Sequence, residues 1–392
     1  MIVFEFKARQ PTEEQAKSID EAIRTSLFIR NKSVALWKNG TSVKRMDLQR
    51  NCKVLASQFP WARNLNSMAR QAAADRGWSS IKNFYDAVKN GNNPGEHYPK
   101  FRKTGRSVEY KTTGWKLDKS CKSIRFTDGF SIGRLRILGT RPLSDFVDII
   151  KRVRIVKRAD GYYVQLSIAA DRKWEKPPTG RCIGIDLGLR HFYTDSDGNR
   201  VGNPRYLSRS LKKLKARQRK LSRSKKRSNR RRKMTNKVAR QHLKVSRQRR
   251  DFVVKAARAL IETNDLVACE DLDVRRMVRD RSYSKGISDV GWGSFIRSLD
   301  YFASISGSTL RKVEPAYTTQ MCNRCGFTAP KEPSERSHRC ACGLVMDRDH
   351  NAAINILNKA LHSTAGHAET TTLVDIKSSA TGPSVTGCKS GG

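Results

Sequence analysis

Acidic residues are scarce in this sequence. Asp and Glu number 36 against 79 Lys and Arg, so the 392-residue chain has a formal net charge of +43. From Gly198 to Arg250 there is no acidic residue at all. Charge repulsion on this scale exceeds what solubility requires, and a merely solvated basic surface does not account for it. The composition therefore predicts a polyanionic partner such as nucleic acid.

Long hydrophobic runs are absent as well. No stretch approaches the roughly 18 uninterrupted apolar residues of a membrane-spanning helix, and residues 1–6 lack the layout of a signal peptide. Hydrophobic residues make up 37% of the chain, which predicts that much of the surface is an interface. We expect a soluble cytoplasmic protein of two or three domains with no membrane partner.

Cysteines are too few and too unevenly placed for a disulfide framework. In a reducing compartment, the clustering of four of the nine predicts one metal site and several unpaired thiols. Two close thiolate pairs suit tetrahedral Zn²⁺ with no open position for water, so a structural role is expected. A glycine after the second cysteine of each pair permits a tight turn, and His338 is the alternative ligand because the second pair has one spacer residue. The cluster is Cys322, Cys325, Cys340 and Cys342, and the scattered thiols are Cys52, Cys121, Cys182, Cys269 and Cys388.

Three carboxylates lie far apart in the sequence, each at the beginning or end of an apolar element. Asp186 and Glu270 each follow a short apolar run of strand type, and Asp349 precedes a short helical pattern, with Asp347 as the neighbouring candidate. Hard carboxylate oxygens suit Mg²⁺ or Mn²⁺, and a pair of such ions can clamp the attacking and leaving oxygens of a phosphodiester. The three acids therefore predict nuclease chemistry.

Each acid also has an ordinary structural explanation. An Asp after a strand is often a turn former, Glu270 could be a surface charge, and Asp347 or Asp349 could cap the following helix. All of these explanations would have to apply at once. Together they are a weaker account than a shared site, because two buried strands each end in an acid.

The N-terminal half combines strand and helix patterns. Residues 1–10 alternate as a strand, residues 11–97 have helical periodicity, and short strands follow to about residue 171, with a tight turn at Arg158–Gly161. We expect an antiparallel barrel whose first strand is 1–10, with the helices inserted. One core is predicted within the helices, from Phe59, Trp61, Met68, Trp78, Ile81, Phe84 and Val88.

The C-terminal half has the pattern of an α/β domain. Strands end at Asp186 and Glu270, a buried helix face spans 292–302, and a further strand covers 308–313, which favours a ribonuclease H type core. About half of residues 209–250 are Lys or Arg. The apolar residues of this segment recur at helical spacing, which predicts a helical hairpin broken near Ser228–Asn229. This density favours phosphate-backbone binding over a solvated face or a localisation tract. We expect the side chains of Arg230, Arg231, Arg232 and Lys233 to contact the nucleic acid.

Motifs in the C-terminal half resemble the TnpB family, also called OrfB. The family is encoded by bacterial insertion sequences and is related to the single-effector type V CRISPR nucleases. The likeness covers about residues 181–358, whereas the N-terminal half resembles the family only in layout. The motifs are Gly184–Gly188, Glu270–Leu272, Tyr317–Gly326 and Cys342–Ile356.

The resemblance implies a multidomain α/β protein. Its RNase H-like (RuvC) core would carry an inserted zinc ribbon, and its N-terminal β-barrel wedge domain would carry a helical recognition insertion. The implied parts are a wedge domain (1–10 and 98–175), a recognition domain (11–97), a nuclease domain (176–316 and 347–361, with the basic hairpin 205–250), a zinc ribbon (317–346) and a disordered tail (362–392).

The resemblance also implies an RNA-guided DNA endonuclease. Asp186, Glu270 and Asp349 match the first, second and third RuvC acids, and Asp347 is the second choice for the third. These acids would hold two Mg²⁺ (or Mn²⁺) ions for hydrolysis of DNA. Two alternatives remain: an RNA-independent transposase that performs strand transfer with the same acids, and a guide-dependent DNA-binding repressor, against which three intact acids argue.

The implied partners are nucleic acids. A guide RNA derived from the transposon end would pair with one strand of double-stranded target DNA, beside a short flanking motif. Residues 59–84 are expected to read that motif, with Gln71 as the candidate. One monomer per RNA and a bacterial, nucleoid-associated location are expected.

Overall fold

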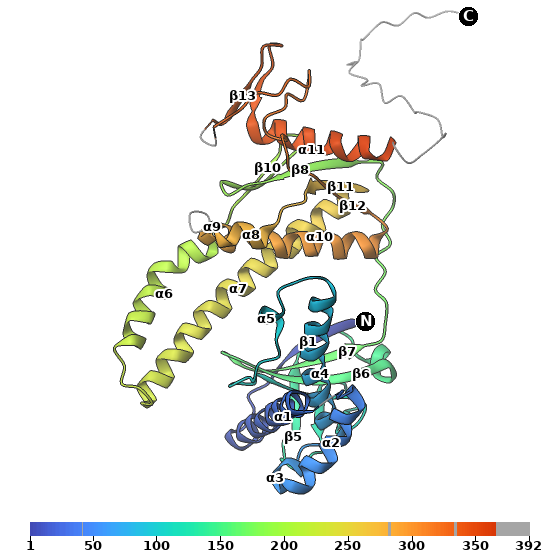
Figure 1. Cartoon of the computed structure of the whole chain (residues 1–392), viewed down its shortest axis with the longest axis vertical. Helices are drawn as coiled ribbons and strands as arrows, with labels where there is room; N and C mark the ends of the chain where they lie inside the picture. Colours follow the sequence, from blue (N-terminus) through green and yellow to red (C-terminus); the bar gives the residue numbers. More distant parts are fainter. Residues whose placement is uncertain (41, 281–283, 333–334, 366–392) are drawn as a thin grey trace, which may run out of the picture. The chain divides into compact units, whose positions relative to one another are not determined.

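The computed structural model describes residues 1–40, 42–280, 284–332 and 335–365 (Figure 1). The chain forms two compact units. Unit 1 comprises Met1–Trp174 and Arg209–Arg247, and unit 2 comprises Glu175–Ser208 and the chain from Gln248 onward. Residues 209–247, which we expected in the nuclease region, thus group with the N-terminal half. None of the described helices is both long enough and apolar enough to cross a membrane.

Unit 1 is built on a seven-stranded antiparallel sheet with the order β2-β6-β7-β1-β5-β4-β3. Residues 2–8 form a strand of this sheet, as the sequence predicted, and this strand, β1, lies in the middle between β7 and β5. Arg158 pairs with Gly161 across the expected tight turn. Within the described residues, the outer strands β2 and β3 are not paired with each other. The strands are β1 (Ile2–Ala8), β2 (Ser107–Tyr110), β3 (Trp115–Leu117), β4 (Ser123–Phe126), β5 (Gly133–Leu138), β6 (Ile150–Arg158) and β7 (Gly161–Ile168).

Five described helices of unit 1 follow β1 directly, as an insertion between β1 and β2, and a 3₁₀ helix lies between β5 and β6. Thr12 caps the first of them, because its hydroxyl accepts the Gln15 N–H. The prediction of a single core is wrong for Trp61 and Val88, which are 43% and 46% exposed. Trp61 lies on a one-turn helix and Val88 lies at the end of a long one, where neighbours cover little of a side chain. The helices are α1 (Glu13–Asn39), α2 (Arg45–Gln58), α3 (Pro60–Arg63), α4 (Ser67–Lys89), α5 (Pro94–His97) and a 3₁₀ helix (Ser144–Ile149).

Unit 2 is built on a five-stranded mixed sheet with the order β10-β9-β8-β11-β12. The strands β8, β9 and β10 form an antiparallel meander, and β11 and β12 run parallel to β8. A separate antiparallel pair, β13 and β14, precedes the last helix. The strands are β8 (Cys182–Leu187), β9 (His191–Asp195), β10 (Arg200–Gly202), β11 (Leu266–Glu270), β12 (Thr309–Val313), β13 (Ser337–Arg339) and β14 (Val345–Asp347).

Helices cover both faces of the unit 2 sheet (Figure 1). On one face, the fully buried Phe192 ring of β9 contacts Phe252 of α7 (Asn229–Thr263) and Phe295 of α10 (Trp292–Ser306), with ring centroids 4.8 and 4.7 Å apart. On the other face α11 (Arg348–Ala365) packs on β8 and β11. It can approach so closely because Gly184 of β8 has no side chain, and a Cβ there would lie 2.2 Å from the Ala353 carbonyl oxygen.

The helices in the second half of the chain match the predicted pattern closely. The basic run is interrupted between Ser222 and Asn229, as expected, and the helix face from Trp292 to Phe302 is buried. Residues 362–365 continue α11, and the rest of the expected tail lies outside the described residues. The helices are α6 (Tyr206–Ser222), α7 (Asn229–Thr263), α8 (Val274–Arg279), α9 (Ser284–Val290), α10 (Trp292–Ser306) and α11 (Arg348–Ala365).

Candidate active site and metal centre

Asp186 and Glu270 lie side by side at the ends of two parallel strands. In the β8–β11 ladder Ile185 pairs with Cys269, and one further step along both strands brings Asp186 opposite Glu270. Each residue is only 9% exposed. Burial raises the pKa of Asp186, and the charges of Glu270 and Asp349 raise it further. The three predicted acids therefore share one electrostatic site, although they come from widely separated parts of the chain.

Glu270 has a specific hydrogen-bond partner. The Thr318 hydroxyl, from the segment between β12 and the first cysteine pair, donates to Glu270 Oε1 at 2.6 Å. Burial raises the pKa of Glu270, whereas this hydrogen bond lowers it because it stabilises the charged form.

Asp349 lies in the first turn of α11, beside an arginine. Its Oδ1 accepts from Arg348 Nε at 3.2 Å and from a terminal nitrogen of the same guanidinium at 3.1 Å. The charge of Arg348 also lowers the pKa of Asp186. One guanidinium therefore offsets part of the negative charge that the carboxylates bring together. A divalent cation offsets such charge more fully, so the carboxylates fit Mg²⁺ or Mn²⁺.

Asp347 has a different environment. Its Oδ1 accepts the backbone N–H groups of Asp349 (3.0 Å) and His350 (3.2 Å), as a helix cap does, and its Oδ2 pairs with Arg200 at 2.7 Å. One oxygen thus caps α11, and the other is paired with a side chain of β10. The helix-cap explanation fits Asp347, which leaves Asp349 as the better candidate for the third acid.

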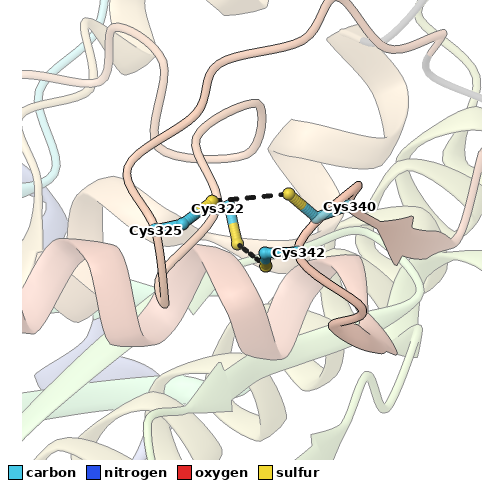
Figure 2. Close-up of side chains that lie close together, drawn as sticks. All are labelled: Cys322, Cys325, Cys340 and Cys342. Carbon is cyan, nitrogen blue, oxygen red and sulfur yellow. Dashed lines mark hydrogen bonds between the residues drawn. The ribbon is translucent and has the colours of Figure 1, made fainter.

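The four predicted cysteines lie close together (Figure 2). Their sulfur atoms are all within 4.8 Å of one another, and the Cys322–Cys342 and Cys325–Cys340 sulfur pairs are 3.7 and 3.5 Å apart. A tetrahedral ion with Zn–S bonds of about 2.3 Å requires sulfur separations of roughly 3.8 Å. The cluster therefore fits zinc. Within the described part of the chain, the carboxylates do not form a comparably tight cluster.

The turns around the cluster explain why glycine follows each pair. Gly326 and Gly343 adopt φ angles of +76° and +86°, which favour glycine. The N–H of Gly326 donates to the Cys322 carbonyl, and the N–H of Gly343 donates to the Cys340 carbonyl, both at 3.0 Å. The single spacer residue of the second pair is compatible with this geometry. The alternative ligand, His338, is buried beside the cluster, and the four thiols are gathered without it.

The zinc site gives a direct test. One zinc ion per chain is expected by elemental analysis, and Cys322→Ser or Cys342→Ser should remove it and expose residues 317–346 to proteolysis, because the ion holds this small segment together. Cys182→Ser, at an exposed thiol outside the cluster, should leave the zinc content unchanged. A fully active protein without zinc would contradict this prediction.

The predicted nucleic-acid contacts differ in their surroundings. Arg230, Arg232 and Lys233 lie on α7, and all three are exposed. Arg231 is half-buried and donates to the carbonyls of Leu221 and Ser224 at 3.0 and 3.1 Å, so it closes the turn between α6 and α7. Gln71 lies half-buried on α4. Within the described residues of unit 1, the contacts of these five side chains do not show whether they bind nucleic acid.

Sequence reasoning missed Thr318 and Arg348 as parts of the site. Thr318 is separated from Glu270 by 48 residues, and no spacing pattern connects a hydroxyl with a distant carboxylate. Arg348 lies between two candidate acids in the sequence, and that position was the one available signal.

Two family models match the chain. Residues 165–281 match the OrfB_IS605 family, described as "Probable transposase", and residues 292–356 match the "Cas12f1-like, TNB domain". The first segment contains Asp186 and Glu270. The second contains the cysteine cluster, Thr318 and Asp349. The residues that form the site thus fall within the matched segments.

Curated relatives span most of the chain. A "Putative RNA-guided DNA endonuclease" of Streptomyces pristinaespiralis is 28% identical over 372 residues, 92% of this chain and 90% of the relative. The "Putative RNA-guided DNA endonuclease InsQ" of Escherichia coli is 28% identical over 80% of this chain and 78% of its own.

Solved structures share the fold. A Cas12f1 protein in complex with sgRNA and target DNA matches with a TM-score of 0.56 and 13% identity, over 88% of this chain and 82% of that one. The mini-RNA-guided endonuclease CRISPR-Cas_phi3 also has a TM-score of 0.56, at 10% identity, over 92% of both chains. The chain therefore has a multidomain α/β fold with an OrfB-type transposase domain and a Cas12f1-like TNB domain, as its resemblance to the TnpB family implied.

Proposed function

We propose that this protein is an RNA-guided DNA endonuclease encoded by an insertion sequence. The observation that carries the proposal is the convergence of Asp186, Glu270 and Asp349 from β8, β11 and α11. The names of the relatives support the same reaction. Hydrolysis of a phosphodiester needs cations at the attacking and leaving oxygens, and three carboxylates that repel one another are suited to hold them.

The fold of the core supports a RuvC-like nuclease. An antiparallel meander, followed by two strands parallel to its first strand, is compatible with a ribonuclease H type core. Its first strand supplies Asp186, its fourth supplies Glu270 and the helix on its face supplies Asp349. When bound, Mg²⁺ (or Mn²⁺) supplies Lewis acidity to the reaction. The protein's own part is to hold the carboxylates in place and to shield them from bulk water.

The guide would read the target by base pairing. A guide RNA from the transposon end would pair with one DNA strand next to a short flanking motif, in a complex of one protein monomer per RNA. The net charge of +43 supports a role in holding two nucleic acids. The helices of unit 1 are the proposed recognition region and its sheet the proposed wedge, with Gln71 as the candidate reader.

The function can be tested on the purified protein. It should purify with a discrete RNA, and digestion of that RNA should abolish cleavage of plasmids that carry the matching sequence. Adding back the transcribed RNA should restore cleavage, whereas an unrelated RNA of equal length should not. RNA-free protein that cuts the same sites with unchanged efficiency would instead favour the RNA-independent transposase.

The basic helices should contribute to nucleic-acid affinity without selecting sequence. Replacing Arg230, Arg232 and Lys233 by Gln should weaken binding to matched and unmatched nucleic acids alike. It should also flatten the slope of log affinity against log salt by about one for each phosphate that is no longer neutralised. Affinity measured at several salt concentrations tests this. Weaker binding to one target sequence alone would contradict a backbone role.

A matched control is available at the neighbouring residue. Arg231→Gln removes one charge and also the hydrogen bonds that close the α6–α7 turn. It should therefore lower the thermal stability of the protein, whereas the triple variant should not.

A further inference from the structure

The Glu270 carboxylate is held by a residue outside the sheet. Thr318 is 1% exposed, and its hydroxyl lies 2.6 Å from Glu270 Oε1 and 3.1 Å from the Pro315 carbonyl oxygen. A hydroxyl has a single proton, and the shorter contact is the one to the carboxylate. A hydrogen bond to one oxygen fixes the rotation of the carboxylate group, and the second oxygen stays available for an ion.

The backbone around Thr318 is attached to the helix that carries Asp349. Asn355 donates through its side chain to the carbonyls of Thr318 (2.9 Å) and Met321 (2.7 Å). Asn351 donates to the same Met321 carbonyl at 2.8 Å, and its own side-chain oxygen accepts the N–H of Asn323 at 3.1 Å. Both asparagines are almost fully buried and lie four residues apart, on one face of α11.

These hydrogen bonds connect the metal centre with the active site. The segment 318–323 contacts Glu270 at one end and contains Cys322, a thiol of the cluster, at the other. Between these points it is hydrogen-bonded to α11, two and six residues after Asp349. One short segment, which also contains a thiol of the cysteine cluster, therefore connects the Glu270 carboxylate with the helix that carries Asp349.

We propose that Thr318 is a positioning residue that orients the Glu270 carboxylate for metal binding, and that the cysteine cluster holds Thr318 in register. This inference rests on the proposed function, because it takes Glu270 as an ion ligand. Removal of a group that orients a ligand commonly costs 10–100-fold in metal affinity or activity. A shift of that size is expected when the Thr318 hydroxyl is removed.

Three variants separate the hydroxyl from the fold. Thr318→Val keeps the shape but removes the donor, Thr318→Ser keeps the donor, and Thr319→Val is the matched control. The Thr319 hydroxyl makes no hydrogen bond within the described residues. Two quantities are measured: the Mg²⁺ concentration for half-maximal cleavage, and Mn²⁺ binding to the RNA-free full chain. For the second, only the binding that Asp186→Ala abolishes is counted.

Thr318→Val should raise the Mg²⁺ requirement and weaken Mn²⁺ binding by about 10-fold or more, with the zinc content unchanged. Thr318→Ser and Thr319→Val should remain close to the parent protein. The inference is overturned if Thr318→Val leaves both metal readouts unchanged, or if Thr318→Ser is as impaired as Thr318→Val. It is also overturned if Thr318→Val lowers only the zinc content or the thermal stability.

The Mn²⁺ measurement separates this inference from the proposed function. If the parent protein binds Mn²⁺ through Asp186 but cuts no DNA with any RNA, the proposed function fails, and the Mn²⁺ affinity of Thr318→Val still decides the positioning role. If the parent protein cuts DNA as proposed and the variant shows the same metal dependence, only the positioning role fails.

Discussion

Replacing Asp186, Glu270 or Asp349 by Ala is expected to reduce DNA cleavage by a factor on the order of 10⁴, the scale on which removal of a catalytic group acts in other hydrolases. Guided DNA binding should change little, because the charges of Glu270 and Asp349 repel that of Asp186, and replacing one of the three acids relieves this repulsion. Cleavage and binding should be measured on the same preparations, each loaded with the same RNA, so that reduced cleavage cannot reflect reduced complex formation.

Asp347→Ala is the matched control for this series. Both oxygens of Asp347 hold the start of α11 and the Arg200 side chain, so its removal should cost about 1 kcal/mol of stability, as removal of a helix cap does. Cleavage should persist. If Asp347→Ala abolished cleavage and Asp349→Ala retained it, Asp347 and not Asp349 would be the third acid.

The convergence of Asp186 and Glu270 could be predicted because of a general property of parallel strands. Two apolar runs that each end in an acid bring those acids to the same edge of the sheet when the strands are neighbours, and the Ile185–Cys269 register confirms that they are. The position of the third acid depends on how a helix packs on the sheet. Asp349 reaches this edge because α11 packs directly on Gly184, and a glycine in a strand does not reveal which helix crosses it.

Choices between neighbouring residues were beyond the sequence. Asp347 and Asp349 are chemically identical. The helix cap is distinguished from the candidate ligand by the backbone N–H groups that donate to Asp347 and by its ion pair with Arg200. Arg231 is likewise one of four adjacent basic residues, and only its hydrogen bonds with Leu221 and Ser224 separate it from the others. Both distinctions depend on where the backbone turns, which residue type does not encode.

The cysteine cluster shows the opposite case. Its ligands could be predicted because thiolates have few other reasons to occur in close pairs. Its connection with the active site could not be predicted, because the hydrogen bonds of Asn351 and Asn355 join residues 28 or more positions apart. Amides of this kind occur in many helices, and their partners are known only when the fold is known.

Among DNA sites that carry the flanking motif, the guide sequence should determine which one is cut. If the guide segment of the copurifying RNA is replaced, cleavage should move to DNA that matches the new segment and carries the same flanking motif, and the original target should survive. The physical reason is that base pairing reads the target, while a protein this basic contributes phosphate contacts that carry no sequence information.

The experiment uses one protein preparation with two guide RNAs and two target plasmids, so that each RNA serves as the control for the other. All four combinations are measured, and only the two matched ones should yield cut DNA. A further plasmid, matched to the guide but altered in the flanking motif, should resist cleavage. Cleavage of the original target with the replaced guide would mean that side chains read the sequence, and strand transfer by a transposase would then be the better account of the three acids.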